Sequence, residues 1–167
     1  GKYFFEPSDV RQWADWGFDY CKYDWALDHT ALARENVAAA QRLVDALNGC
    51  GRDMVLELSN SIPLKQAAEY AALGQVNRTT GDLIDLWDRS QMGRERTWAV
   101  GIREVWLEND AYAPFQRPGH WNHACNLRIG LLGGWRDQGL TPSRLTPDEQ
   151  YTHVTLWCLW SSPMIIG

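Results

Sequence analysis

The sequence predicts an α/β protein in which parallel strands are joined by crossover helices. Strand and helix patterns alternate along the 167 residues, and only short turns separate them. The length is sufficient for one domain with a hydrophobic core. The alternation fits either an open doubly wound sheet or part of a (β/α)8 barrel, and the polar residues described below decide between them.

The first half of the chain is predicted to alternate helix, strand, helix, strand and helix. These elements span residues 8–16, 17–24, 30–48, 54–58 and 63–73. Ser8 is expected to cap the first helix, and Gly17 is expected to end it. The second helix carries apolar residues near helical spacing and is closed by Gly49. Glu57 interrupts an otherwise apolar strand, and Gly74 closes the third helix.

The second half of the chain continues the alternation. Its predicted strands span residues 75–78, 118–121 and 161–167, and its predicted helices span residues 94–110 and 146–160. The last helix has the clearest start, because Thr146 can act as the N-cap, Pro147 takes the first helical position and Glu149 completes a capping box. On that helix His153 and Trp157 are expected to pack in the core. Solvated helix charges are expected at Asp85, Asp88 and Arg89.

Polar residues gather where the predicted strands end. They are Asp24, Ser59, Arg78, Asp82 and the Trp121-Asn122-His123 group. Barrel enzymes build their active sites at the C-terminal ends of the strands. No G-x-G-x-x-G or P-loop motif follows a predicted strand, so a nucleotide-binding sheet loses support. We therefore predict an α/β fold that is a partial (β/α)8 TIM barrel, approximately strands 4 to 8 of its eight strands with their helices.

Composition excludes several function classes. The net charge is -5, from 16 basic and 21 acidic residues, and no basic stripe suggests nucleic acid. No apolar run approaches the roughly 18 residues that a membrane span needs. The 10 Trp residues are typical of sugar-binding sites, because aromatic faces stack on sugars, but they also fill cores. The four cysteines show no zinc spacing, so neither a metal nor a cofactor is expected.

The strand 17–24 ends on a charged pair. Residues two apart in a strand share a face, so Lys22 and Asp24 point to one side of the sheet. Such charges are costly to bury unless they pair or take part in chemistry. From this strand alone, a structural salt bridge and a catalytic pair both remain open. By the same alternation Glu57 lies on the side of Ser59, and it is expected to point into the barrel.

Asp24 and Asp82 end different predicted strands. Two carboxylates across one pocket are what glycoside hydrolysis requires, one ionised and one able to deliver a proton. A cation beside a carboxylate favours its ionised form, so Lys22 is expected to keep Asp24 charged. Arg78, four residues before Asp82, could hold a sugar hydroxyl or orient a carboxylate.

Several segments, in order along the chain, resemble a known family. They are Asp15-Trp16-Gly17-Phe18-Asp19-Tyr20-Cys21-Lys22-Tyr23-Asp24, Arg78-Thr79-Thr80-Gly81-Asp82-Leu83, Pro118-Gly119-His120-Trp121-Asn122, Leu145-Thr146-Pro147-Asp148-Glu149-Gln150-Tyr151-Thr152-His153 and Ser162-Pro163-Met164-Ile165-Ile166-Gly167. Together they resemble glycoside hydrolase family 27, the α-galactosidase or melibiase family, in its bacterial form. The resemblance covers nearly all of the chain.

The resemblance implies a retaining mechanism with Asp24 as the nucleophile and Asp82 as the acid/base. It also implies that Lys22 and Arg78 bind the sugar, and Trp25, directly after the nucleophile, is the candidate for a pocket wall. Residues 1–167 are then expected to be the C-terminal part of a catalytic domain whose early strands are missing. A β-sandwich normally follows the barrel in this family, so we expect both ends of the chain to be cut.

The chain departs from the family pattern after Trp121-Asn122. The family usually continues Asp-Pro-Asp-Met, whereas this chain has His123-Ala124-Cys125-Asn126. The second Asp of that motif lines the sugar pocket, so Cys125 is expected to stand there in its place. Ser59 lies where animal members vary between galactose and N-acetylgalactosamine recognition, and it is a further substrate-binding candidate.

The expected function is a retaining exo-glycosidase that hydrolyses terminal α-D-galactosyl residues, with carbohydrate as the partner. Alternatives within the family are N-acetyl-α-galactosaminidase, β-L-arabinopyranosidase and isomalto-dextranase activity. A non-catalytic sugar-binding relative is the alternative from another class, motivated by the altered segment at Cys125. The full-length parent is expected to be secreted or periplasmic, and its oligomeric state is left open.

Overall fold

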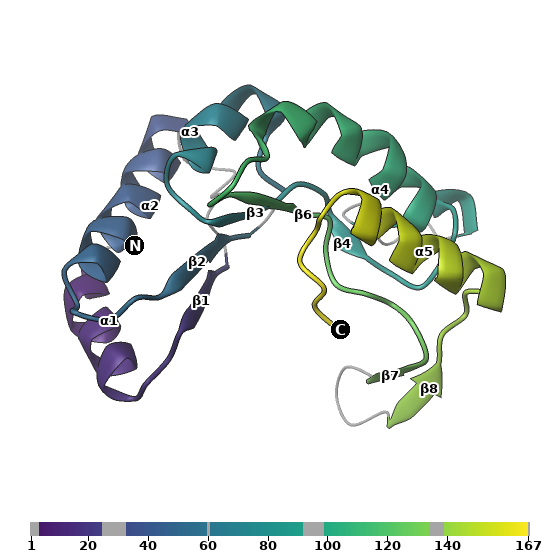
Figure 1. Ribbon diagram of the computed structural model, residues 1–167, viewed down its shortest axis with the longest axis horizontal. Helices are drawn as coiled ribbons and strands as arrows, with labels where there is room; N and C mark the ends of the chain where they lie inside the picture. Colours follow the sequence, from purple (N-terminus) through teal and green to yellow (C-terminus); the bar gives the residue numbers. More distant parts are fainter. Residues whose placement is uncertain (1–3, 25–32, 60, 92–98, 134–138, 167) are drawn as a thin grey trace. The chain divides into compact units, whose positions relative to one another are not determined.

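The computed structural model describes residues 4–24, 33–59, 61–91, 99–133 and 139–166 (Figure 1). They belong to two compact units. The first unit comprises Gly1–Arg78 and Arg117–His120, and the second comprises Thr79–Gln116 and Trp121–Gly167. Each unit contains both helices and strands, which confirms the predicted α/β class.

The first unit is built on a parallel sheet in the order β1-β2-β3. Its strands are β1 (Tyr20–Tyr23), β2 (Val55–Leu58) and β3 (Val76–Arg78). Lys22 lies opposite Glu57, and Glu57 lies opposite Val76. Adjacent strands in a parallel sheet require a crossover, usually a helix, and this is the arrangement that the alternating sequence predicts.

Helices cover one face of this sheet (Figure 1). They are α1 (Glu6–Asp15), α2 (Ala33–Asn48) and α3 (Ala67–Ala71), the last preceded by the 3-10 turn η1 (Leu64–Gln66). The core between helices and sheet includes the buried side chains of Val10, Leu43, Leu56, Leu58 and Tyr70. Leu56 and Leu58 alternate with Glu57 along β2, so the opposite face of the sheet carries the polar residues.

The predicted N-cap of the first helix is wrong. Helix α1 begins at Glu6, and Ser8 lies inside its first turn, where its hydroxyl donates to the Phe5 carbonyl at 2.8 Å. Pro7 explains the earlier start, because a first turn leaves backbone N–H groups unpaired and proline has none to lose. The predicted end is confirmed, since Gly17 has a φ of 83° and donates to Ala14 at 3.0 Å.

The second unit contains two separate pairs of strands. Strand β4 (Asp82–Leu83) pairs in parallel with β5 (Ala99–Val100), and β7 (Leu131–Gly133) pairs in an antiparallel hairpin with β8 (Leu140–Pro142). The strand β6 (Trp121–His123) also belongs to this unit, and the Thr79 N–H donates to the His123 carbonyl at 3.1 Å. The sequence did not predict the hairpin, which connects short segments with little alternation.

The helices of the second unit are α4 and α5. Helix α4 (Ile102–Asn109) continues into the 3-10 segment η3 (Asp110–Phe115), and α5 spans Pro147–Leu159. The predicted capping box of α5 is confirmed, because the Glu149 N–H donates to the Thr146 hydroxyl at 3.3 Å. The core of this unit includes Leu83, Val100, Ile102, Val105 and Trp157.

Two predicted elements begin later than the sequence suggested. The helix expected over 94–110 begins at Ile102, because Ala99–Val100 form β5; residues 94–98 lie outside the described part of the chain. The strand expected over 118–121 begins at Trp121, because Arg117 and His120 close a tight turn in which Gly119 has a φ of 87°. The last predicted strand is reduced to one bridge, between Leu127 and Ile166.

No described helix is both long enough and apolar enough to cross a membrane.

Candidate active site

The open face of the first sheet carries three of the seven predicted site residues, namely Lys22, Ser59 and Arg78. Strand register and alternation place on it Tyr20, Lys22, Glu57, Ser59 and Arg78. Residues from neighbouring parallel strands that share a face lie next to each other, and Ser59 and Arg78 stand at the C-terminal ends of their strands. Asp24 follows β1 at the same end of the sheet. The strand register thus agrees with the predicted placement of Lys22, Ser59 and Arg78 on one face, and their joint role in a site stays a prediction.

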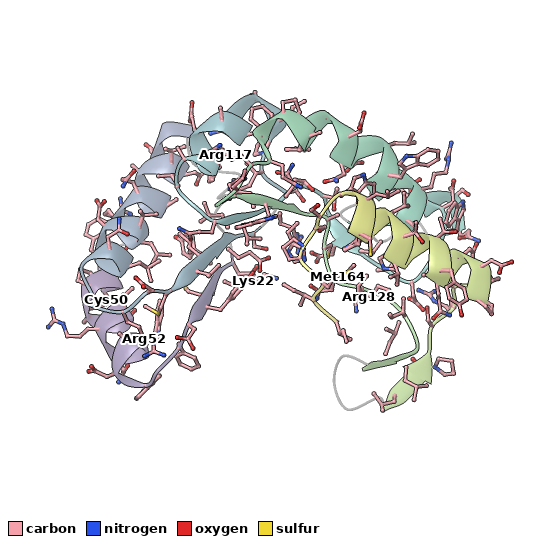
Figure 2. All side chains as sticks on the ribbon, in the orientation of Figure 1. Lys22, Cys50, Arg52, Arg117, Arg128 and Met164 are labelled. Carbon is pink, nitrogen blue, oxygen red and sulfur yellow. The ribbon has the colours of Figure 1, made fainter. Side chains whose placement is uncertain are left out.

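Lys22 and Asp24 are both exposed. Lys22 extends from β1 on the side away from helices α1 and α2 (Figure 2). Within the described residues, Lys22 and Asp24 form no ion pair with each other. The described part of the structure therefore shows no salt bridge between Lys22 and Asp24, and the catalytic interpretation of this pair stays a prediction.

Glu57 is a buried carboxylate on the same face. Its side chain is only 1% exposed, and the Tyr20 hydroxyl donates to Oε2 at 2.6 Å. Burial of the phenol raises the pKa of Tyr20 far above its usual value, and the hydrogen bond to Glu57 raises it further, so Tyr20 remains a donor. Glu57 thus lies on the face of Lys22 and Ser59, as the alternation along β2 predicted, and the lining of a barrel interior by this face stays a prediction.

Asp82, the predicted acid/base, opens strand β4 in the second unit. The next residue, Leu83, is fully buried, and its N–H donates to Cys125 Sγ at 3.4 Å. Cys125 itself is 3% exposed with a φ of 77°, and its carbonyl accepts from the Trp157 indole at 2.8 Å. The Cys125 side chain is therefore packed in the core beside the segment that carries Asp82, and its contact with substrate stays a prediction.

Asp85 and Asp88 are not the solvated helix charges that the sequence predicted. Both lie in the connection between β4 and η2 (Arg89–Gln91), and each pairs with an arginine distant in sequence. Asp85 accepts from Arg144 at 2.6 Å, and Asp88 accepts from Arg103 at 2.7 Å. Burial alone would raise the pKa of Asp85, but the hydrogen bonds and charge of Arg144 hold it below its usual range.

The predicted site residues divide between the units. Lys22, Asp24, Ser59 and Arg78 belong to the first unit, and Asp82 and Cys125 belong to the second. The spacing of Asp24 and Asp82 stays a prediction, and Trp25 lies outside the described residues. Over the described parts of the chain, no group of three or more His, Cys, Asp or Glu side chains is arranged to hold a metal ion.

One hollow lies away from these residues. It has a volume of about 400 Å³ and lies where α1 meets α2, with Glu6, Arg11 and Arg42 in its lining. None of the predicted site residues lines it. The hollow is lined by residues of α1 and α2 and of the segments next to them, and not by the strand ends.

The sequence is similar to named α-galactosidases over nearly its whole length. It is 28% identical over 166 residues to "Alpha-galactosidase A" from Cellvibrio japonicus, covering 97% of this chain and 36% of that protein. It is 28% identical over 162 residues to "Alpha-galactosidase 2" from Arabidopsis thaliana, covering 97% of this chain and 34% of the relative. The chain thus spans about a third of the length of these relatives.

A solved structure agrees with these relatives. The GH27 β-L-arabinopyranosidase from Geobacillus stearothermophilus, in complex with arabinose, superposes with a TM-score of 0.78. It is 26% identical, and the match covers 98% of this chain and 36% of that enzyme. The family model described as alpha galactosidase A matches residues 1–167. The chain therefore belongs to the alpha galactosidase A family, as its strand-end motifs predicted.

Proposed function

We propose that the protein containing this chain is a retaining exo-glycosidase that hydrolyses terminal α-D-galactosyl residues of oligosaccharides or glycoconjugates. The observation that carries the proposal is the open face of the first sheet, where Lys22, Glu57 and Arg78 lie at neighbouring positions and Asp24 follows at the strand end. Membership of a family whose relatives are named α-galactosidases supports the same conclusion.

The chemistry assigns a different step to each carboxylate. The Asp24 carboxylate attacks the anomeric carbon and forms a glycosyl ester, while Asp82 gives its proton to the departing glycosidic oxygen. Asp82, now ionised, then takes a proton from water as that water attacks the anomeric carbon and releases Asp24. Two inversions leave the configuration of the sugar unchanged. In this proposal Lys22 and Arg78 bind the substrate, and Trp25, Ser59 and Cys125 make additional contacts with it.

The architecture follows from the same proposal. Residues 1–167 would form the C-terminal part of a TIM-barrel catalytic domain, approximately strands 4 to 8. The parallel sheet of the first unit and its helical cover support this arrangement. Because Asp24 attacks directly, no water needs to fit between its carboxylate and the anomeric carbon, so we expect the carboxyl groups of Asp24 and Asp82 to lie about 5–5.5 Å apart.

A β-L-arabinopyranosidase is the second candidate, because the solved relative bound to arabinose carries that name. β-L-Arabinopyranose has the ring configuration of α-D-galactose without the exocyclic hydroxymethyl group. The two activities therefore share the chemistry of Asp24 and Asp82 and differ only in the pocket around that group. Comparing kcat/KM for the 4-nitrophenyl derivatives of both sugars and of N-acetyl-α-galactosamine distinguishes the candidates.

The proposal is tested by replacing Asp24 in the full-length protein. Asp24→Asn should abolish turnover of 4-nitrophenyl α-galactoside, because an amide cannot form the glycosyl ester. Asp19→Asn is the matched control, since Asp19 precedes the same strand at its other end and pairs with Arg52. Near-normal rates in Asp24→Asn would overturn the assignment, and equal losses in both variants would show damage to the strand instead.

A further inference from the structure

The base of the β7–β8 hairpin places two arginines on its two arms. Arg128 precedes β7, and Arg144 follows β8. Beyond the paired strands the arms remain joined, because the Ser143 N–H donates to the Gly130 carbonyl at 2.8 Å and the Ser143 hydroxyl donates to the Arg128 carbonyl at 2.9 Å. The hairpin thus fixes the separation of the two arginines.

Both arginines bind the segment that directly follows Asp82. Arg128 Nε donates to the Leu83 carbonyl at 2.9 Å. Arg144 binds Asp85 through Nε at 3.0 Å, through Nη2 at 2.6 Å and through its backbone N–H at 2.9 Å. A bidentate arginine–carboxylate salt bridge of this kind restricts the orientation of the two side chains as well as the distance between them.

The same segment is held from its other sides. Leu83 N–H donates to Cys125 Sγ at 3.4 Å, and Ile84 N–H donates to the Val100 carbonyl at 3.0 Å. Arg128 is itself fixed, because its backbone N–H donates to His153 Nε2 at 3.0 Å. Strand β4 has only two residues, so these contacts add to its pairing with β5 in holding its backbone.

We propose that Arg128 and Arg144 are positioning residues for Asp82, an inference that rests on the proposed function of Asp82 as acid/base. An aspartate has two side-chain torsions, so the position of its carboxyl group follows closely from its backbone. A proton donor must lie within hydrogen-bond reach of the glycosidic oxygen, and a displacement of about 1 Å can reduce the rate by about 10²-fold. The two arginines act on that distance through Leu83 and Asp85.

Leaving-group dependence tests this role in the full-length protein. A sugar or alkyl leaving group needs a proton from Asp82, whereas 2,4-dinitrophenolate leaves without one. Arg144→Ala should therefore lower kcat/KM for an α-galactosyl disaccharide about tenfold, a fraction of the 10²–10⁴-fold that general acid catalysis contributes. The value for 2,4-dinitrophenyl α-galactoside should change less than about twofold by the same reasoning.

Arg103→Ala is the matched control. Arg103 pairs with Asp88 in the same unit at 2.7 Å, and its side chain is 52% exposed against 56% for Arg144. It should leave the ratio between the two substrates unchanged. Arg144→Lys keeps the positive charge but cannot form the bidentate hydrogen bonds of a guanidinium. Its ratio of kcat/KM for the two substrates should therefore lie between the ratios of the wild type and of Arg144→Ala. Adding Asp85→Ala to Arg144→Ala should cause little further loss, because both act through one contact.

The outcomes separate this inference from the proposed function. Asp82→Ala should lower kcat/KM for the disaccharide and not for 2,4-dinitrophenyl α-galactoside. If it lowers both values or neither, the role of Asp82 as acid/base is refuted. If Asp82→Ala shows the loss but Arg144→Ala and Arg128→Met slow both substrates equally or neither, only the positioning role is refuted. Arg144→Ala decides the case if Arg128→Met does not fold, since the Arg144 side chain is 56% exposed.

Discussion

His153 should make the stability of this protein depend on pH between about 4 and 6.5. Its side chain is completely buried, Nε2 accepts the Arg128 N–H at 3.0 Å, and the ring packs edge-on against Trp157 at 4.1 Å between centroids. Burial lowers the pKa of His153 from 6.5 to about 4, and the nearby charge of Arg128 lowers it as well. A protonated ring could no longer accept the Arg128 N–H.

The sign follows from proton uptake on unfolding. Between pH 6.5 and 4 the unfolded chain protonates His153 and the native protein does not. The free energy of unfolding is therefore fully retained above pH 6.5 and falls as the pH decreases toward 4. Because each pKa unit corresponds to about 1.36 kcal/mol, lowering the pKa of His153 from 6.5 to about 4 means that the free energy of unfolding decreases by about 3 kcal/mol over this pH range.

Urea unfolding from pH 7.5 to 4.5 measures this loss, with His153→Gln as the comparison. Glutamine offers an acceptor to Arg128 but does not titrate, so the variant should lose most of the pH dependence above pH 5. Carboxylates such as Asp85 contribute in both proteins at the lower end of the range and cancel in the difference. An equal slope in the two proteins would refute the argument.

Two further substitutions test particular contacts. Gly101→Ala should lower the free energy of unfolding by about 1–3 kcal/mol in urea unfolding, because a Cβ there would lie 2.9 Å from the carbonyl oxygens of Leu86 and Trp87. An unchanged free energy of unfolding would show that the loop moves to accommodate the methyl group at no cost. Tyr20→Phe should lower the free energy of unfolding by about 1.5–3 kcal/mol, because it removes a hydrogen bond to the buried Glu57 carboxylate. A smaller effect of the same substitution in a Glu57→Gln background would confirm that the two residues interact.

The sequence predicted the parts of the fold that rest on local patterns. The alternation of apolar strands and amphipathic helices led to the parallel order β1-β2-β3. The capping box at Thr146 located the start of α5, and the two-residue period of β1 and β2 placed Lys22 and Glu57 on one face. Each of these signals lies within a few residues of the feature that it predicts.

The errors arose where distant contacts decide the structure. Ala99–Val100 form a strand only because they pair with Asp82–Leu83. No local sequence pattern predicts a strand of two residues. The local sequence predicts a solvated charge at Asp85 because its partner, Arg144, is 59 residues away in a loop segment. Arg144 was missed for the same reason, although its position next to the Thr146 capping box could have directed attention to it.

The assignment of Asp24 as the nucleophile is the central claim, and isolation of the glycosyl-enzyme tests it most directly. The full-length protein would be treated with a fluorinated α-galactosyl fluoride, which forms the ester faster than the ester hydrolyses, and its peptides would be analysed by mass spectrometry. We expect one fluorinated galactosyl adduct, on the peptide that contains Asp24 and on that carboxylate. An adduct on another residue, or turnover without any adduct and with inversion at the anomeric carbon, would contradict it.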